Sequence, residues 1–366
     1  MKQERELNFE LLRCILMFMV VVVHYNNVKM GNAFSYVTPG SLNYYFLHLA
    51  ESLSIIGTNG FVLLTGYFSR NKDRTSLRKP VGLFLYVIAY KVLFYVLERM
   101  ILKEAFTIKG ILFSFVPSNW FIVLYVVLVL LSPYINRAVR ELSQKSFLIL
   151  LIMSFLLFSV WPTILDIVEL KFGIETMEIN TVSLNGTSSG YSIVNFVMLY
   201  LIGAFISRFQ VLRYAKRWDV LGYLICTGII FVQELVLYDG WSYANPFVIL
   251  SAIFFMNIFR KIQIASRFLN VIAKATLGVY LIHTHSLIWN VLWTKFDIKG
   301  ACQGSLAECV WNMLLCCFVT YLFCVILDIV GRRISAPVSK LLDTIGILNK
   351  NVIQASSEHV VPAGKR

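Results

Sequence analysis

The sequence contains few charged residues. Lys, Arg, Asp and Glu make up 14% of its 366 residues, whereas a soluble domain averages about 25%. Apolar residues account for 58%, and the mean hydropathy is +0.72. This balance excludes both a soluble globular domain and a disordered chain. A bilayer accepts so much apolar surface, and at about 20 residues per crossing the length allows about ten transmembrane helices.

Other common signals are also missing. The seven cysteines form no Cys-x-x-Cys pair, so neither a zinc site nor a thioredoxin-like redox site is predicted. No small-x-small cleavage site follows the first apolar run, 15–23, because His24-Tyr25-Asn26-Asn27 comes next. We therefore expect a retained first helix rather than a signal peptide. No repeat relates the two halves of the chain, which weighs against a symmetric transporter.

Ten apolar stretches predict the transmembrane helices. Two of them carry unusual polar residues: Glu51 and Asn59 in the second, His283 and His285 in the ninth. Such segments are inserted when other helices shield them from lipid. The predicted fold is an all-α polytopic membrane helix bundle with about ten spans, at residues 8–25, 46–68, 80–98, 119–136, 147–168, 192–207, 219–238, 245–259, 271–293 and 308–330.

The basic residues alternate along these stretches. With the N-terminus in the cytoplasm, cytoplasmic segments hold 24 of the 33 Lys and Arg, external loops hold seven, and Arg13 and Lys91 lie within helices. Cytoplasmic loops are enriched in Lys and Arg, so this pattern accounts for the net charge of +13 without nucleic-acid binding. Both termini are predicted to be cytoplasmic. Residues 1–335 form the predicted transmembrane domain, and 336–366 form a cytoplasmic tail that we expect to be disordered from about 351.

The first helix carries two ionisable residues at a meaningful spacing. An ionisable side chain inside a membrane costs about 2.5–3.5 kcal/mol even on the lenient insertion scale. Arg13 and His24 are eleven residues apart, so they lie within about 20° of one another on the helix and about 16 Å apart along it. This arrangement suits an elongated ligand with an anionic end and a reactive end. Alternatively, Arg13 anchors the helix at the interface and His24 marks its outer end.

Four motifs, in order along the chain, resemble those of the acyltransferase 3 family of integral membrane acyltransferases. The first consists of Arg13, ten residues and His24. The others are the segments 60–68 (GFVLLTGYF), 119–134, which begins with Asn119-Trp120-Phe121-Ile122, and 276–283, which ends with Tyr280-Leu281-Ile282-His283. The similarity covers about residues 5–335, and the chain resembles the single-domain members of the family.

The resemblance implies a multi-pass plasma-membrane enzyme and, by analogy with surface-glycan modifiers, a bacterial cytoplasmic (inner) membrane. The implied donor is cytoplasmic acyl-CoA, acetyl-CoA in most members. The implied acceptor is a hydroxyl of a lipid-linked or cell-surface polysaccharide, so the reaction is an O-acetylation of the cell envelope. Membrane lipids surround the protein. We expect no bound cofactor, no metal site and no nucleic-acid partner, and we predict no oligomeric state.

The resemblance makes His24 the candidate catalytic residue. Neutral histidine is present at physiological pH, so His24 is expected to act as the general base on the acceptor hydroxyl. A covalent acyl-histidine step is the alternative. Phosphate groups of the donor are expected to meet cationic side chains, because Arg binds phosphate through a planar fork of donors. The candidates are Arg13, Arg74, Arg78 and Lys79.

The loop 70–79 departs from the family's usual Arg-x-x-Arg pattern, which leaves open which Arg contacts the donor. Its charges alternatively serve as an ordinary topology signal.

Six further residues are expected on the acceptor side or in supporting roles. Oxyanion donors are needed, and Asn59, Asn119 and Tyr280 are candidates. Glu51 is expected to orient His24 or bind sugar, and Trp120 to stack on a sugar ring, although both are also typical of a membrane interface. His283 lies one turn after Tyr280, where a structural hydrogen bond or a role in the site is expected.

Two other functions remain open from the sequence. A transporter or flippase for a glycan or lipid accounts for ten helices and intramembrane charge without chemistry. A structural subunit of an envelope assembly is the third reading. A transferase should lose its function in His24→Ala, whereas a flippase should tolerate this change and need no acyl-CoA.

Overall fold

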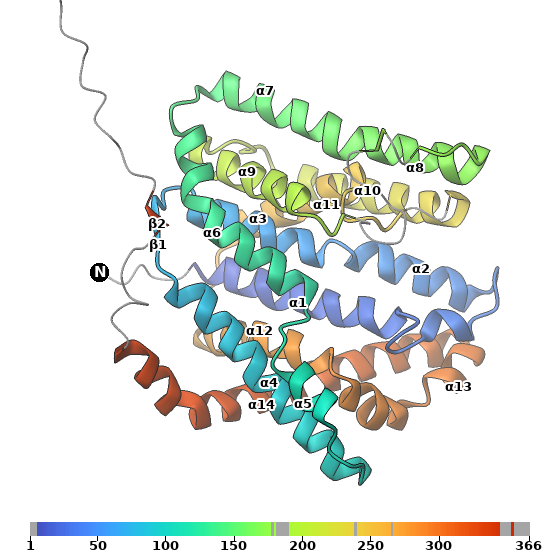
Figure 1. Ribbon diagram of the computed structural model, residues 1–366. Coiled ribbons are helices and arrows are strands. Elements are labelled where there is room, and N and C mark those ends of the chain that lie inside the picture. Colours follow the sequence, from blue (N-terminus) through green and yellow to red (C-terminus); the bar gives the residue numbers. More distant parts are fainter. Residues whose placement is uncertain are drawn as a thin grey trace, which may run out of the picture.

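A computed structural model describes residues 6–176, 179–180, 190–237, 240–264, 266–344 and 353–354. The described chain is a helical bundle (Figure 1). Its elements are α1 (Leu7–Asn26), η1 (Ala33–Tyr36), α2 (Leu42–Ser54), α3 (Gly57–Ser69), β1 (Arg74–Thr75), α4 (Arg78–Leu102), α5 (Ile108–Ser114), α6 (Trp120–Arg140), α7 (Gln144–Phe155), η2 (Leu156–Val160), α8 (Trp161–Phe172), α9 (Ile193–Phe209), α10 (Lys216–Leu237), α11 (Pro246–Arg260), α12 (Arg267–His283), η3 (Ile288–Leu292), η4 (Trp293–Phe296), α13 (Ile298–Gln303), α14 (Leu306–Thr344) and β2 (Ile353–Gln354).

The helices confirm an all-α membrane bundle. Within the described residues, seven helical segments are long and apolar enough to cross a membrane. An eighth candidate is a pair of segments, Leu269–His283 and Ile288–Phe296, bent by 79° at the break. Two shorter apolar helices, α9 and α11, account for the remaining predicted stretches. Nine of the ten stretches therefore coincide with apolar helical segments, whereas the ninth, 271–293, is a bent pair instead of the single straight helix that the sequence predicts. A count of ten crossings stays a prediction.

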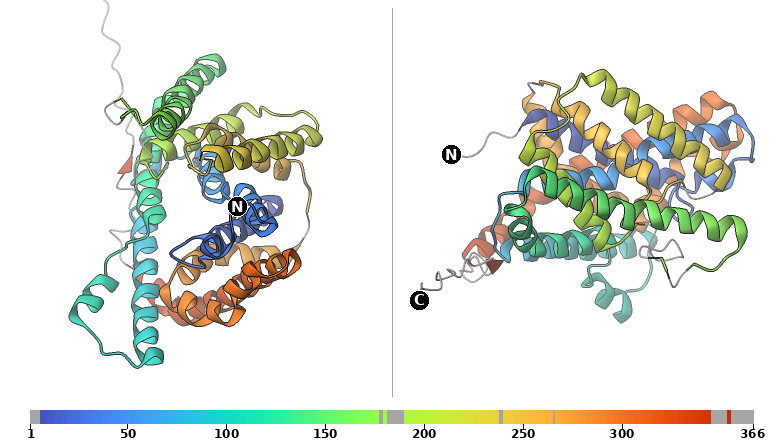
Figure 2. Two further views of the ribbon diagram at one scale, coloured as in Figure 1. Left: turned by 90° about the vertical axis from the view of Figure 1, so that its right-hand side faces the viewer. Right: turned by 90° about the horizontal axis from the view of Figure 1, so that it is seen from above.

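The first residues of α1 and the last residues of α14 lie at the same end of the bundle, next to β1 (Figure 1). The end-on view shows α1 in the middle, with α4 and α6 along one side (left panel of Figure 2). The charge distribution predicts that this common end faces the cytoplasm.

α1 joins two hydrophobic cores. Its first half, including Phe9, Leu12 and Leu16, packs with α3, α7, α9, α10 and α11. Its second half, including Val21 and Tyr25, packs with α4, α12, η3 and α14. Residues on α1 are therefore held from both sides, which fixes the helix that carries Arg13 and His24.

Two glycines allow α3 and α9 to approach closely. A Cβ atom on Gly66 would lie 1.9 Å from the Tyr200 carbonyl oxygen, and one on Gly203 would lie 2.1 Å from the Leu63 carbonyl oxygen. Small residues at helix contacts permit such packing in membranes. This contact places the end of α3, and so the loop that follows it, against α9.

The end of the chain contributes one short strand. β2 pairs antiparallel with β1, with Arg74 opposite Gln354 and Thr75 opposite Ile353. The rest of the segment from 351, which the sequence predicts to be disordered, lies outside the described residues.

Candidate active site

A cavity of about 380 Å³ runs inside the bundle between α1, α3, α4, α6 and α12. Ligand-binding cavities in proteins have volumes of about 300–1,000 Å³. Apolar side chains line its middle, including Met17, Val20, Phe61, Phe121 and Leu277. The two ends differ in chemistry, and both Arg13 and His24 line it. The spacing on the first helix therefore places both side chains on one cavity, as the sequence suggests.

Three cations line one end, which we call the cationic end: Arg13, Lys72 and Lys79. Arg13 forms an ion pair with Glu10, and its guanidinium lies 5.4 Å from the centre of the Phe68 ring. This end lies beside the loop between α3 and α4. Even after pairing with Glu10, the cationic end carries a surplus of positive charge.

Hydrogen bonds from α6 hold the loop that presents Lys72. The Asn136 amide nitrogen donates to the carbonyl oxygens of Ser69 (2.7 Å) and Lys72 (2.8 Å). The Tyr200 hydroxyl in turn donates to the Asn136 side-chain oxygen (2.8 Å). Partial desolvation and the neighbouring Lys79 ammonium lower the pKa of Lys72. A bound anion would relieve this repulsion between cations.

The structure separates the four predicted donor-binding residues. Arg13 and Lys79 line the cavity, whereas Arg74 and Arg78 are exposed and are not part of its lining. Lys72, which is not among these four, also lines the cavity. Their donor-binding roles stay predictions.

His24 lies at the other end, which we call the histidine end. Its Nδ1 atom lies 2.7 Å from Nε2 of His283. His283 is fully buried, and its Nδ1 atom lies 2.5 Å from the Val279 carbonyl oxygen. The sequence motif that ends in His283 is thus brought directly against the motif that ends in His24.

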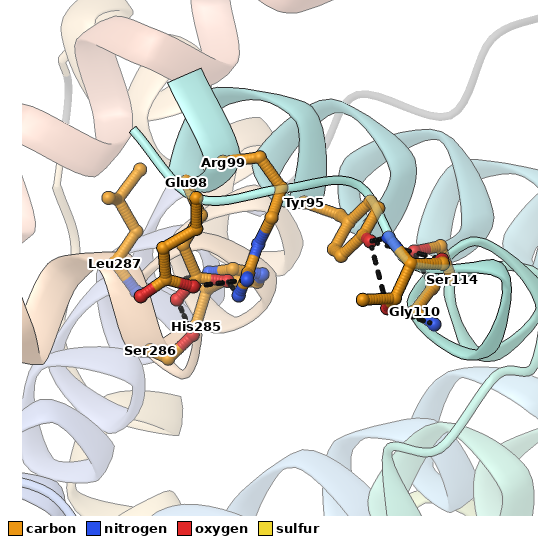
Figure 3. Close-up of polar contacts among 10 residues, drawn as sticks. Tyr95, Glu98, Arg99, Gly110, Ser114, His285, Ser286 and Leu287 are labelled. Carbon is orange, nitrogen blue, oxygen red and sulfur yellow. Dashed lines mark hydrogen bonds and ion pairs between the residues drawn. The ribbon is translucent and has the colours of Figure 1, made fainter. Parts of the chain in front are cut away.

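The chain bend after His283 is fixed by polar contacts. The Ser286 hydroxyl donates to the Glu98 carboxylate (2.6 Å), which forms an ion pair with Arg99 (3.6 Å) (Figure 3). The Leu287 amide donates to Nδ1 of His285 (3.2 Å). The Ser286–Glu98 bond ties the break between α12 and η3, which follows His283, to the end of α4.

Among the aromatic side chains that line the histidine end, three form a cluster. The centre of the Trp120 ring lies 4.2 Å from that of Tyr191 and 5.8 Å from that of Tyr243. Burial and then the Glu51 carboxylate raise the pKa of Tyr191, and burial and then Tyr191 raise the pKa of Tyr243. Both hydroxyls therefore stay protonated and can donate hydrogen bonds. We call Trp120, Tyr191 and Tyr243 the aromatic platform.

Buried amides position this platform. The side-chain nitrogens of Asn59 (2.9 Å) and Asn195 (3.3 Å) donate to the Tyr243 carbonyl oxygen. Gly190 adopts φ +81°, and a Cβ atom there would lie 2.4 Å from the Ala244 nitrogen. Asn59 is fully buried and is not part of the cavity lining, so its amide supports Tyr243 in this structure.

The other predicted residues lie around the histidine end. Tyr280 lines the cavity, and Asn119 interacts with its hydroxyl. Glu51 is buried behind the lining, where it accepts a hydrogen bond from the Asn26 amide (2.9 Å). It therefore contacts α1 two residues after His24 and does not contact His24 itself. The structure brings together His24, His283, Trp120 and Tyr280.

Three lining residues were missed from the sequence. Lys72 belongs to the cationic loop 70–79 but is not among the four donor-binding candidates, and Tyr191 and Tyr243 lie in loops with no motif. Tyrosines just before two predicted helices were the available signal, since aromatic side chains gather at membrane interfaces. Within the described ranges, no group of three His, Cys, Asp or Glu side chains could hold a metal ion.

The fold and the cavity define an integral membrane protein with a ligand-sized chamber inside its helical bundle. The sequence matches the acyltransferase 3 family, described as an acyltransferase domain, over residues 6–329. The chain therefore belongs to this family of membrane acyltransferases. No curated protein and no solved structure matched the chain.

Proposed function

We propose that this acyltransferase moves an acyl group, acetyl in the first instance, from cytoplasmic acyl-CoA to a hydroxyl of a lipid-linked or surface glycan. The observation that carries the proposal is the single cavity that joins the cationic end to His24. The proposed cellular location is the bacterial cytoplasmic membrane. The proposed reaction needs no bound cofactor or metal.

The donor is proposed to enter from the cationic end. Its phosphates would meet Arg13, Lys72 and Lys79, because charge-assisted hydrogen bonds to phosphate are stronger than neutral ones. Its linear arm would lie along the apolar middle of the cavity. The rise of α1 between Arg13 and His24, about 16 Å, then sets where the thioester lies.

The acceptor is proposed to bind at the histidine end. Sugar rings present C–H bonds on one face, and these favour the negative face of an aromatic ring. The aromatic platform provides such faces together with two protonated tyrosine hydroxyls. An acceptor seated there would place a hydroxyl group beside His24.

The proposed reaction has balanced proton steps. His24 Nε2 takes the proton of the acceptor hydroxyl as its oxygen attacks the thioester carbonyl carbon. The Tyr280 hydroxyl, with Asn119 beside it, is the proposed donor to the oxyanion. The carbon–sulfur bond then breaks, and the CoA thiolate receives the proton from His24. The products are the glycan ester and CoA thiol.

Acyl transfer in membrane vesicles tests the proposal. Inverted vesicles that contain the host's envelope glycans receive isotope-labelled acetyl-CoA on the cytoplasmic face. Wild type, His24→Ala and the control His48→Gln are compared at matched protein levels. His48 is a suitable control because it lies on α2 away from the cavity, with Nδ1 2.8 Å from the Tyr44 carbonyl oxygen.

We expect base-labile label in the glycan with wild type and with His48→Gln, and none with His24→Ala. Equal label with His24→Ala would remove His24 from the mechanism. Absence of label with wild type, together with glycan translocation that needs no acyl-CoA, would favour a flippase.

A further inference from the structure

The hydrogen-bond partners of His24 and His283 determine which of their ring nitrogens carry protons. His283 is fully buried, and each of its ring nitrogens has one partner. A carbonyl oxygen only accepts hydrogen bonds, so the contact with Val279 O requires a proton on His283 Nδ1. A neutral imidazole carries one proton, so His283 Nε2 is left with a lone pair.

The same reasoning fixes the state of His24. Because His283 Nε2 accepts, the proton between the two rings belongs to His24 Nδ1. Its Nε2 atom then carries the lone pair. Within the described part of the chain Nε2 has no hydrogen-bond partner, yet it is not an enclosed atom, because the ring lines the cavity.

We propose that His283 is a positioning residue that holds His24 in the Nδ1–H tautomer, so that the basic Nε2 faces the cavity. The inference deepens the proposed function and rests on it for its catalytic purpose, although the tautomer itself can be measured without any reaction. Val279 O, His283 and His24 form one chain of hydrogen bonds that ends at the acceptor.

This arrangement differs from a histidine held by a carboxylate. No Asp or Glu contacts His283 among the described residues, so the partner of His24 is a neutral ring. A neutral partner fixes the tautomer and ring orientation without a buried negative charge, which is expensive in a membrane. Glu51, the carboxylate that the sequence suggests for orienting His24, accepts a hydrogen bond from Asn26 instead.

The first test measures protonation directly. Protein labelled with ¹⁵N-histidine in lipid nanodiscs contains five histidines, and His24→Gln and His283→Gln assign the two relevant ones by loss of signal. We expect a protonated Nδ1 and an unprotonated Nε2 for both rings. A protonated Nε2 on His24 at neutral pH would overturn the inference, whether or not the protein transfers acyl groups.

The second test compares two substitutions of His283 that differ in whether the new side chain can accept a hydrogen bond from His24. His283→Leu replaces the imidazole with an apolar side chain that cannot accept from His24, whereas His283→Gln can accept through Oε1. We expect kcat to fall at least about a hundredfold in His283→Leu, with the KM for acyl-CoA unchanged. His283→Gln should restore most of the rate.

The pH profile separates this role from a structural one. Wild type and His283→Gln should reach a plateau as His24 loses its proton, while the residual rate of His283→Leu should keep rising with hydroxide. An unchanged plateau in a folded His283→Leu would overturn the inference. Absence of transfer in wild type would count against the proposed function, and the tautomer measurement would still decide the inference.

Discussion

The cationic end and the histidine end of the cavity are held by different kinds of interaction. Lys72 and Lys79 lie beside an exposed loop, and α6 holds this loop by bonds to its backbone carbonyls and by the Arg140–Asp73 ion pair rather than by bonds to the ammonium groups of these two lysines. At the histidine end, His24, His283 and Tyr243 are fixed by bonds between segments far apart in the sequence. Attraction between charges falls off gradually with distance, whereas proton transfer needs heavy atoms within about 2.6–3.2 Å. Donor binding at the cationic end therefore tolerates loosely held charges, whereas the proton transfer proposed at the histidine end needs the fixed side chains found there.

Removal of the base should produce the largest effect and should act on kcat. His24→Ala is expected to reduce kcat by about 10²- to 10⁴-fold, because general-base catalysis contributes that much. Initial rates at saturating acyl-CoA measure it, with His48→Gln as the control. A rate within threefold of wild type would break the assignment of chemistry to the histidine end.

Removal of a cation should act on donor binding instead. Arg13→Gln is expected to raise the KM for acyl-CoA by about ten- to a hundredfold, because hydrogen bonds to charged groups contribute about 1.5–3 kcal/mol. Arg213→Gln, an exposed cation that does not line the cavity, provides the control. A lower kcat with an unchanged KM would mean that the two ends do not divide the work as proposed.

Removal of one ring from the aromatic platform should act on the acceptor alone. Trp120→Ala is expected to raise the acceptor KM by about tenfold, since aromatic contacts contribute about 0.5–1.5 kcal/mol beyond the area they bury. The donor KM should not change. Trp311→Ala removes a ring that is 71% exposed and serves as the control. Equal effects of the two substitutions would contradict a binding role for the platform.

The smallest effect is expected from pH at the cationic end. Since the pKa of Lys72 is lowered, its charge is lost at a lower pH than that of an ordinary lysine. A bound phosphate favours the charged form, so the KM for acyl-CoA should rise a few-fold as the pH increases into the alkaline range. In Lys72→Gln the KM should start higher and vary less with pH. A KM that falls as pH rises would exclude an anion-binding role for Lys72.

The sequence predicts the membrane bundle well because its signals are local. Each apolar stretch is a continuous run, and a helix satisfies every backbone group inside that run. The positions of Arg13 and His24 on one cavity also follow from one regular helix. At the 79° bend after His283, however, the sequence predicts one straight helix, because no Pro or Gly marks the break.

The remainder of the site depends on contacts that no local pattern contains. His283 meets His24 across 259 positions of the chain. Asn59, proposed from the sequence as an oxyanion donor, instead donates to the backbone at Tyr243. Glu51 contacts Asn26 rather than His24. In each case the residue type predicts a polar role, while the partner is set by how the helices pack.

The enclosed segment Leu42–Ser69 has a consequence for how the protein is made. In its most apolar window 83% of the residues are buried inside the protein, and α9, α10 and α11 provide much of this cover. Yet α9 begins only at Ile193, so the ribosome delivers the segment long before its shielding arrives. A nascent chain that stops before α9 would present Glu51 and Asn59 to lipid with few protein partners. We therefore expect such truncated chains to be retained by the insertion machinery or degraded, while chains that reach the end of α11 become stably integrated.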